Sequence, residues 1–424
     1  MSLSVENSVG YPIEITNITA TSTTGGKVTI QPNITLMPGK SQVLVLSKIF
    51  TAASQGSHIS TAVSITYKEI SQPLPGPYIS TGSITGSTPT IVYPANYTFA
   101  AVSKLTITNS QSAATPSPFQ QMVNITSSDN GFQLISPDFG QNVEFFYSNG
   151  TVIPSWLESY SSSNAIWWLK LGSIPASSSI TVYMGIAPTS TNLFNGVNVG
   201  EAPQLPCYEE GITNTSKCSV YGEYDNGANV FNFYDNFAGT SLNTSKWTIT
   251  TASSFSVNNG LTFTGTSGGG TDNIFATSVP TFSAPLIVDM YGEETGTTSW
   301  FGIEMLNYYG SGGVLFYNQN RYTFGQAISI FNGSDEIFNS GGSANNYYFW
   351  TATENGGVAS YYLYSGSVYG TVVTSVTSGS SYYSATSGHI YLADNGGSAF
   401  IQYLRVRAYP PNGVMPSTSF GSVA

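Results

Sequence analysis

The chain has 424 residues, of which 8% are charged, and 22 Asp and Glu against 11 Lys and Arg give it a formal net charge of −11. This balance argues against nucleic-acid binding, because phosphate neutralisation requires clustered cations. With 44 Gly, 28 Tyr and 23 Phe, the composition favours strands and turns over helices. It predicts an all-β extracellular or cell-surface protein, and its few titratable carboxylates are consistent with tolerance of acid.

The alternation of apolar and polar residues predicts three tandem β-sandwich domains. Residues 1–92 form the first, which resembles an immunoglobulin-like or pilin-like sandwich and ends in a Pro- and Gly-rich linker over 71–94. Residues 93–200 form the second sandwich, residues 201–231 a connector, and residues 232–424 the third and largest sandwich.

The connector contains both cysteines of the chain, Cys207 and Cys218. Two cysteines without neighbouring histidines are too few for a structural zinc site, so a disulfide that closes a short loop is expected. The alternative is a pair of free thiols in a reducing compartment. No apolar run approaches the length of a transmembrane helix. Residues 1–9 lack the basic and apolar regions of a signal peptide, so none is expected at this start.

The second sandwich contains a specific pattern. Residues 143–160 read VEFFYSNGTVIPSWLESY and residues 166–186 read IWWLKLGSIPASSSITVYMGI. This stretch resembles a domain of unknown function found in prokaryotic, notably archaeal, surface proteins, which implies a small β-sandwich without an assigned activity. The residues that carry the resemblance are Pro154, Trp156, Glu158, Trp167, Trp168, Lys170, Ile174, Pro175 and Ala176.

The third sandwich resembles the concanavalin-like or laminin-G-like fold of laminarinase-type glycoside hydrolases and related binding modules. Its opening strand is DNFAGTSLNTSKW at 235–247 and its closing strand IQYLRVRAYPP at 401–411. The resemblance implies a structural calcium ion, with Asp235 as a candidate ligand. Asn236 stands where the family has a second acid, and Gln402 stands where it has an Asp that helps to hold the ion.

The first sandwich resembles the β domain of archaeal pilin-like proteins through VSITYKEI at 63–70 and the Pro- and Gly-rich stretch that follows. Its exposed edge strands would then pair with another copy of the chain. The partners expected on this basis are other copies, envelope proteins or surface glycans.

No catalytic set is evident, and the chain is predicted not to be an enzyme. Glycoside hydrolysis requires a pair of carboxylates, whereas Glu304 stands alone, and Asp289 and Glu293 are interpreted as a solvated strand end. The nucleophile-elbow pattern at 265–269 lies in Gly- and Thr-rich sequence, and the chain has only two histidines. Asp225, Asp235 and Asp394 are candidate calcium ligands, for which Asx-turns are the competing interpretation.

A glycan-binding face is predicted on the third sandwich. In SWFGIEMLNYY, alternation places Phe301, Ile303 and Met305 on the core face and Trp300, Glu304 and Tyr308 on the other. Arg321 and Trp350 are predicted to join that second set across the sheet, while burial of these aromatic rings between the sheets is the competing interpretation. Eight sequons are candidate N-glycosylation sites: Asn17, Asn33, Asn96, Asn124, Asn149, Asn214, Asn243 and Asn332.

Three functions remain open. The first is a non-enzymatic extracellular or surface protein that acts in adhesion, as a filament component or in the envelope. The second is a polysaccharide-binding protein that uses the third sandwich, and the third, weaker alternative is a glycoside hydrolase.

Overall fold

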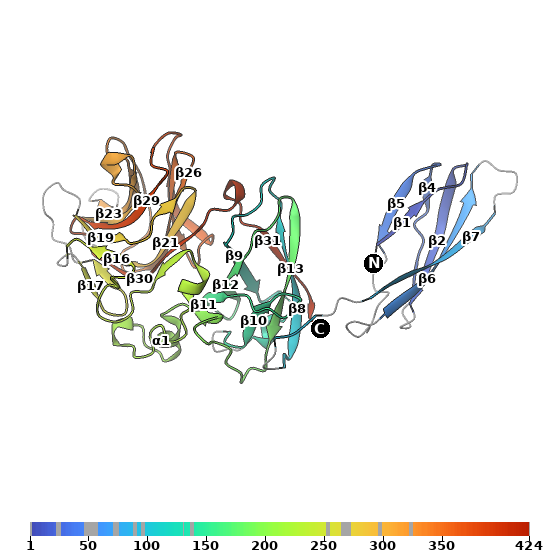
Figure 1. The fold of residues 1–424 in the computed structure, drawn as a ribbon, viewed down its shortest axis with the longest axis horizontal. Coiled ribbons are helices and arrows are strands. Elements are labelled where there is room, and N and C mark those ends of the chain that lie inside the picture. Colours follow the sequence, from blue (N-terminus) through green and yellow to red (C-terminus); the bar gives the residue numbers. More distant parts are fainter. Residues whose placement is uncertain are drawn as a thin grey trace. The chain divides into compact units, whose positions relative to one another are not determined.

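The structure is a computed structural model that describes residues 2–22, 27–45, 58–70, 76–87, 91–94, 98–129, 131–135, 140–251, 255–263, 273–295, 299–321 and 325–423. Strands dominate it, which confirms the predicted all-β class (Figure 1). The chain divides into two compact units, Met1–Val92 and Tyr93–Ala424. In the described part of the chain, no helix is long and apolar enough to cross a membrane.

The first unit is a small antiparallel sandwich. One sheet has the order β3-β2-β6-β7, with β4 also pairing with β2, and the other sheet is β1-β5. The core between them is small and aliphatic, with Ile15 and Ile18 fully buried. The strands are β1 (Ser2–Glu6), β2 (Ile13–Ser22), β3 (Lys27–Ile30), β4 (Ile34–Leu36), β5 (Ser41–Val45), β6 (His58–Glu69) and β7 (Tyr78–Ser87).

Strand β7 lies inside the stretch interpreted from the sequence as a linker. It pairs with β6 from Tyr67↔Tyr78 to His58↔Ser87. Gly76, two residues before this strand, has φ +83°, and the Ile and Thr residues of the strand have high strand propensity. The linker interpretation is therefore wrong for residues 78–87.

The middle sandwich opens the second unit and consists of two four-stranded sheets, β10-β13-β8-β31 and β14-β11-β12-β9. The last strand of the chain, β31, pairs with β8, so the C-terminal segment returns to this sandwich after the third one is complete. The strands are β8 (Ala101–Asn109), β9 (Phe119–Thr126), β10 (Val143–Phe146), β11 (Ser155–Tyr160), β12 (Asn164–Leu171), β13 (Ser178–Ile186), β14 (Val199–Glu201) and β31 (Ser417–Val423).

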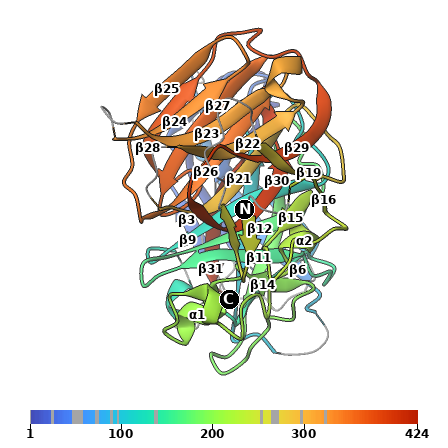
Figure 2. The ribbon, with the colours of Figure 1, turned by 90° about the vertical axis from the view of Figure 1, so that its left-hand side faces the viewer.

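The third sandwich packs two eight-stranded sheets face to face, as expected of a concanavalin-like fold (Figure 2). The β30 sheet consists of β17 (Phe255–Val257), β18 (Leu261–Phe263), β30 (Ala399–Ala408), β21 (Leu286–Glu294), β26 (Tyr347–Asn355), β27 (Val358–Ser365) and β28 (Thr371–Thr377), with β15 (Phe233–Asp235) beside β30. The β29 sheet consists of β16 (Trp247–Ile249), β19 (Asn273–Ser278), β29 (Ser387–Asp394), β22 (Trp300–Leu306), β23 (Val314–Arg321), β24 (Gly325–Phe331) and β25 (Glu336–Ser340), with β20 (Phe282–Ser283) beside β29. The predicted closing strand coincides with β30 over residues 401–408. The predicted opening strand is wrong for residues 236–246, which form no strand, and overlaps β15 only at Asp235. β15 itself pairs with β30.

The middle and third sandwiches share a hydrophobic core, which includes Trp156 and Trp168 from one and Tyr403 from the other. A buried ion cluster lies in this contact. Arg405 contacts Glu158 of the middle sandwich at 2.6 Å and Asp289 of its own sheet at 2.8 Å. All three of these charged side chains have no exposed surface.

Three further contacts stabilise this cluster. The guanidinium of Arg407 contacts Asp289 at 2.7 Å, and that of Arg405 lies 4.4 Å from the centroid of the Trp168 ring. The indole N–H of Trp168 donates to Glu158 at 2.8 Å. The Pro-x-Trp-x-Glu pattern thus supplies part of the contact with the third sandwich.

The connector carries the short helices α1 (Leu205–Glu209) and α2 (Gly227–Val230). In the described part of the second unit, 3-10 turns occur at Phe132–Leu134, Thr215–Lys217, Tyr309–Ser311 and Pro411–Gly413. Cys207 and Cys218 form a disulfide, which confirms that prediction. In Figure 1, the connector lies along the edge where the middle and third sandwiches meet.

Candidate functional site

A row of five side chains crosses the β30 sheet on the face turned away from its own core. Consecutive register pairs link Ser256↔Thr262, Thr262↔Phe400, Phe400↔Glu293 and Glu293↔Tyr347. Alternation puts them on one face, because Leu261, Phe263, Ala399 and Ile401 on either side of Thr262 and Phe400 enter the core. With strands about 4.8 Å apart, the row extends roughly 19 Å.

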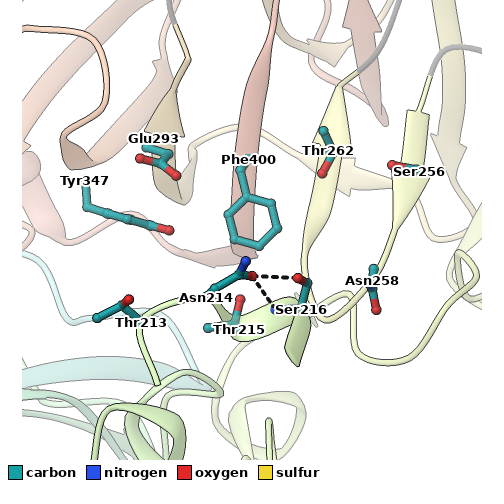
Figure 3. A pocket seen from close by; sticks show the side chains of 10 residues that line it. All are labelled: Thr213, Asn214, Thr215, Ser216, Ser256, Asn258, Thr262, Glu293, Tyr347 and Phe400. Carbon is teal, nitrogen blue, oxygen red and sulfur yellow. Dashed lines mark hydrogen bonds between the residues drawn. The ribbon is translucent and has the colours of Figure 1, made fainter. Parts of the chain in front are cut away.

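This row lines one side of a groove of about 590 Å³, and Thr213, Asn214, Thr215 and Ser216 of the connector line the other (Figure 3). Contacts with Asn259 hold the connector in place. The Asn259 side-chain amide donates to the carbonyl oxygens of Thr215 at 3.3 Å and Cys218 at 3.0 Å. The hydroxyl of Thr215 donates to the Asn259 carbonyl oxygen at 3.1 Å. Because Cys218 is part of the disulfide, the same loop that the disulfide closes forms a groove wall.

An aromatic ring occupies the middle of the row. Phe400 is half-buried and lies over Gly260, where a Cβ atom would come within 2.2 Å of the ring. Gly260 has φ +139°, so a side chain there would be both strained and obstructed. The Phe400 ring can occupy this position because Gly260 has no side chain. In Figure 3 the ring points toward Asn214 across the groove.

Next to the ring stand a phenol and a carboxylate. Burial, with contributions from Tyr208 and Glu293, raises the pKa of the Tyr347 hydroxyl. Tyr347 therefore remains a neutral donor at any physiological pH. Hydroxyls and amides of Asn214, Ser216 and the other lining residues complete the surface. An aromatic ring beside several uncharged polar groups is the combination that binds sugars.

Among the described residues that line the groove, Glu293 is the one carboxylate. Asp289 lies on the same face of β21 but is fully buried and is occupied by Arg405, Arg407 and the hydroxyl of Thr351 at 2.8 Å. The interpretation of Asp289 and Glu293 as a solvated strand end was therefore wrong for Asp289. The contact between the middle and third sandwiches buries Asp289, and no local sequence pattern indicates this burial.

The predicted glycan face lies elsewhere, on the outer side of the β29 sheet, and the structure assembles it only in part. Trp300 is half-buried against Tyr317, with ring centroids 5.6 Å apart, and Tyr308 is 37% exposed. Phe301, Ile303 and Met305 enter the core as predicted. Arg321 ends β23, and its side chain lies outside the described residues.

The prediction that Glu304 and Trp350 belong to this face is wrong. Glu304 has no exposed surface and accepts the backbone N–H of Tyr309 at 3.1 Å. Trp350 belongs to β26 of the opposite sheet, is 2% exposed, and packs edge-on against Phe301 inside the core. It therefore cannot contact a ligand on the outer face. The sequence places Trp350 on a strand but does not assign that strand to a sheet.

Asp235 does not fit the predicted calcium site. Its carboxylate oxygens accept the indole N–H of Trp247 at 2.7 Å and the ammonium of Lys246 at 3.2 Å. Gln402, at the family's Asp position, donates to the hydroxyl of Tyr208 at 2.9 Å. Lys246 and Trp247 thus satisfy the Asp235 carboxylate that the resemblance assigned to a metal ion.

Two other candidate ligands are also engaged. Asp225 accepts hydrogen bonds from Trp156, Tyr234 and Asn236 at 2.7 to 2.8 Å. Asp394 accepts a hydrogen bond from the backbone N–H of Gly396, as expected of an Asx-turn. The elbow pattern at 265–269 lies outside the described residues.

The sequons differ in exposure. Asn33, Asn124, Asn149, Asn214 and Asn243 are exposed, Asn17 and Asn332 are half-buried, and Asn96 lies outside the described residues.

The sequence reasoning missed Phe400, Tyr347 and the connector wall. A signal was present, because Phe400 precedes the recognised closing strand and Glu293 had been noticed, but register is needed to join them.

Comparisons with known proteins agree with the description of the middle sandwich. The family DUF2341, a domain of unknown function, matches residues 139–202. Uncharacterized protein 562 of Sulfolobus islandicus rod-shaped virus 1 is 30% identical over 365 residues, which cover 74% of this chain and 58% of that protein. The chain thus spans little more than half the length of this relative.

Two solved structures with a distant likeness to this chain illustrate the structural comparison. A glycosyl hydrolase family protein from Mycobacterium fortuitum is 15% identical, with a TM-score of 0.31, and the match covers 42% of this chain and 99% of that one. The endo-beta-1,3-glucanase of Pyrococcus furiosus is 12% identical, with a TM-score of 0.32, over 46% of this chain and 95% of that one. Likenesses this distant carry no conclusion about activity.

Proposed function

We propose that the protein is a non-enzymatic extracellular or cell-surface adhesion protein that binds a polysaccharide in the groove of its third sandwich. The observation that supports this proposal is the continuous row from Ser256 to Tyr347, with Phe400 at its centre and the connector opposite. The row is long enough for several sugar rings, the Phe400 ring offers an apolar face, and the surrounding groups are hydroxyls, amides and one acid.

Binding accounts for this groove better than hydrolysis does. Glycoside hydrolysis requires two carboxyl groups on either side of the scissile bond, about 5 to 9.5 Å apart. The described lining offers Glu293 alone, and its neighbour on the same face, Asp289, is committed to two arginines. A single carboxylate that accepts hydrogen bonds from sugar hydroxyls is sufficient for recognition.

Replacement of Phe400 by Ala is expected to weaken polysaccharide retention by about tenfold, because the ring supplies roughly 1.5 kcal/mol or more of contact energy. Affinity electrophoresis against a panel of polysaccharides, with thermal unfolding as a check on folding, measures this effect. Trp300→Ala on the outer face of the β29 sheet is the matched aromatic control and should leave retention unchanged.

The competing outcomes are distinct in the same experiment. Retention lost in Trp300→Ala but kept in Phe400→Ala would transfer the site to the outer face. New reducing ends released from the retained polysaccharide by wild-type protein, and none by Glu293→Gln, would establish a hydrolase. Binding unaffected by either aromatic substitution would refute a site on this sandwich.

A second candidate function is assembly with other copies through the first unit. Strand β7 is ten residues long, has no charge and no proline, and pairs only with β6 among the described residues. Such an edge is a template for another strand, since natural edges are usually protected by charge, proline or brevity. Ile79 on this strand is 66% exposed.

This candidate predicts concentration-dependent polymers that electron microscopy and sedimentation detect. Ile79→Lys places a charge on the edge and is expected to abolish the polymers while the unit remains folded. Wild-type protein that stays monomeric at high concentration would rule out this route of assembly.

A further inference from the structure

A second, smaller cavity lies between the connector and the middle sandwich, remote from the groove's lining. It has a volume of about 100 Å³, and four carboxylates line it: Glu201, Glu209, Glu210 and Glu223. The amides of Gln141 and Asn192 also line it, and no Lys, Arg or His is among its described lining residues. Four acids around one small space are notable in a chain with 22 Asp and Glu in total.

Glu201 is the member that a surface cluster does not explain. It is 2% exposed, its Oε2 atom has no hydrogen-bond partner, and it lines the cavity. A buried carboxylate without a partner is costly, and proteins avoid one unless a cation or proton neutralises it.

The backbone fixes this carboxylate in place. Glu201 ends β14, pairs with Leu157 of β11, and donates its N–H to the Tyr224 carbonyl oxygen at 3.3 Å. The preceding Gly200 lies so close to that loop that a Cβ atom would come within 2.1 Å of the same oxygen. The loop that bears Glu223 is therefore held against the strand that bears Glu201, and neither can move apart without breaking the sheet edge.

We propose that this cavity is a calcium site, in which Glu201 is the buried ligand and the connector acids complete the charge. Carboxylate and amide oxygens without histidine or cysteine select a hard cation. Ca²⁺ tolerates ligands from several segments, whereas Mg²⁺ demands near-octahedral geometry. No three acidic, histidine or cysteine side chains in the described ranges already stand at ligand spacing. Glu201, amide oxygens and water would therefore bind the ion directly, and the connector acids would balance its charge.

Such an ion would link the middle sandwich, through Glu201 and Gln141, to the connector that carries Glu209 and Glu223. The same connector carries the disulfide and the groove wall at 213–216. Calcium would thereby stabilise the connector at a cavity whose lining shares no residue with the groove. The site does not depend on whether the groove binds a polysaccharide.

The test uses the full chain after treatment with a chelator. Calcium chloride is expected to raise the melting temperature in a saturable way and to displace Tb³⁺, whose luminescence Tyr224 beside the cavity would sensitise. Glu201→Gln is expected to abolish both effects, since the amide keeps the shape but loses the charge. It should also leave the calcium-free protein at least as stable as wild type, because the unpaired carboxylate is gone.

Glu294→Gln is the matched control, since Glu294 is another buried glutamate with an oxygen that lacks a partner, and it should retain the calcium response. A wild-type melting temperature that calcium does not change would overturn the proposal. So would a calcium response that survives Glu201→Gln, and an equal response to Mg²⁺ would overturn the choice of calcium.

Discussion

Replacement of Arg405 by Met is expected to destabilise the second unit by about 3–5 kcal/mol. Arg405 is fully buried and neutralises Glu158, with 2.6 Å between its guanidinium and the Glu158 carboxylate. Without it, Glu158 would remain buried and, among the described residues, would keep the Trp168 indole N–H as its hydrogen-bond donor. The substitution would also remove a guanidinium that packs against Trp168, Phe231 and Trp156.

Urea unfolding measures this loss, and two variants interpret it. Arg405→Met combined with Glu158→Gln should recover part of the stability, because no charge is then left unpaired. Lys104→Met, at an exposed position of β8, is the matched cation control and should change stability by no more than about 0.5 kcal/mol. An Arg405→Met protein as stable as Lys104→Met would show that the cluster does not hold the two sandwiches together.

The second large effect concerns pH, and we expect the protein to be more stable near pH 5 than near pH 8. Glu294 and Glu354 face the core of the third sandwich and are 3% and 0% exposed. Burial raises the pKa of Glu294 to about 8 and that of Glu354 well above its ordinary value. Both oxygens of Glu354 and one of Glu294 lack a hydrogen-bond partner.

The direction follows from proton linkage. Between about pH 4.5 and 8 the folded protein keeps these protons and the unfolded chain releases them, so the free energy of unfolding falls as pH rises. Each group contributes up to about 1.4 kcal/mol for each pH unit in that window. Asp289 acts in the opposite sense at lower pH. Burial alone would raise the pKa of Asp289, but Arg407 and Arg405 outweigh burial and hold that pKa below its ordinary value. Stability is therefore lost when Asp289 is protonated in stronger acid.

Denaturant unfolding in chelator at about pH 5, 6.5 and 8 measures the slope. The double variant Glu294→Gln and Glu354→Gln should make the slope shallower, since neither amide titrates. Asp335→Asn, at an exposed position of the same sandwich, should leave the slope unchanged. Stability that rises from pH 5 to pH 8 in the wild type would contradict the expected burial of neutral carboxyl groups.

Local pattern predicted more of the middle sandwich than of any other part. Trp156, Glu158 and Trp168 were identified as members of one pattern, and DUF2341 matches that stretch. Their role was not predictable, because Trp156 and Glu158 contact Tyr403 and Arg405, more than two hundred residues later. A pattern of spacing within one domain contains no information about the surface that another domain presents to it.

The candidate sites show the same division. Alternation placed Phe301, Ile303 and Met305 in the core, and proximity along the chain placed Cys207 with Cys218. The groove required Ser256, Thr262, Phe400, Glu293 and Tyr347 to lie side by side, which depends on the register of five strands. A shift of one residue in any strand would turn its member of the row into the core.

The sequence by itself determined the all-β class and the disulfide, because these follow from composition, period and short spacing. Its resemblance to concanavalin-like proteins indicated the strand that closes the third sandwich. The tertiary structure decided which acids are exposed. Asp289 and Glu304 are buried, Glu293 lines a groove, and Glu201 lines a second cavity. Burial of a charge depends on what the rest of the chain packs against it, and that packing is a property of the fold as a whole.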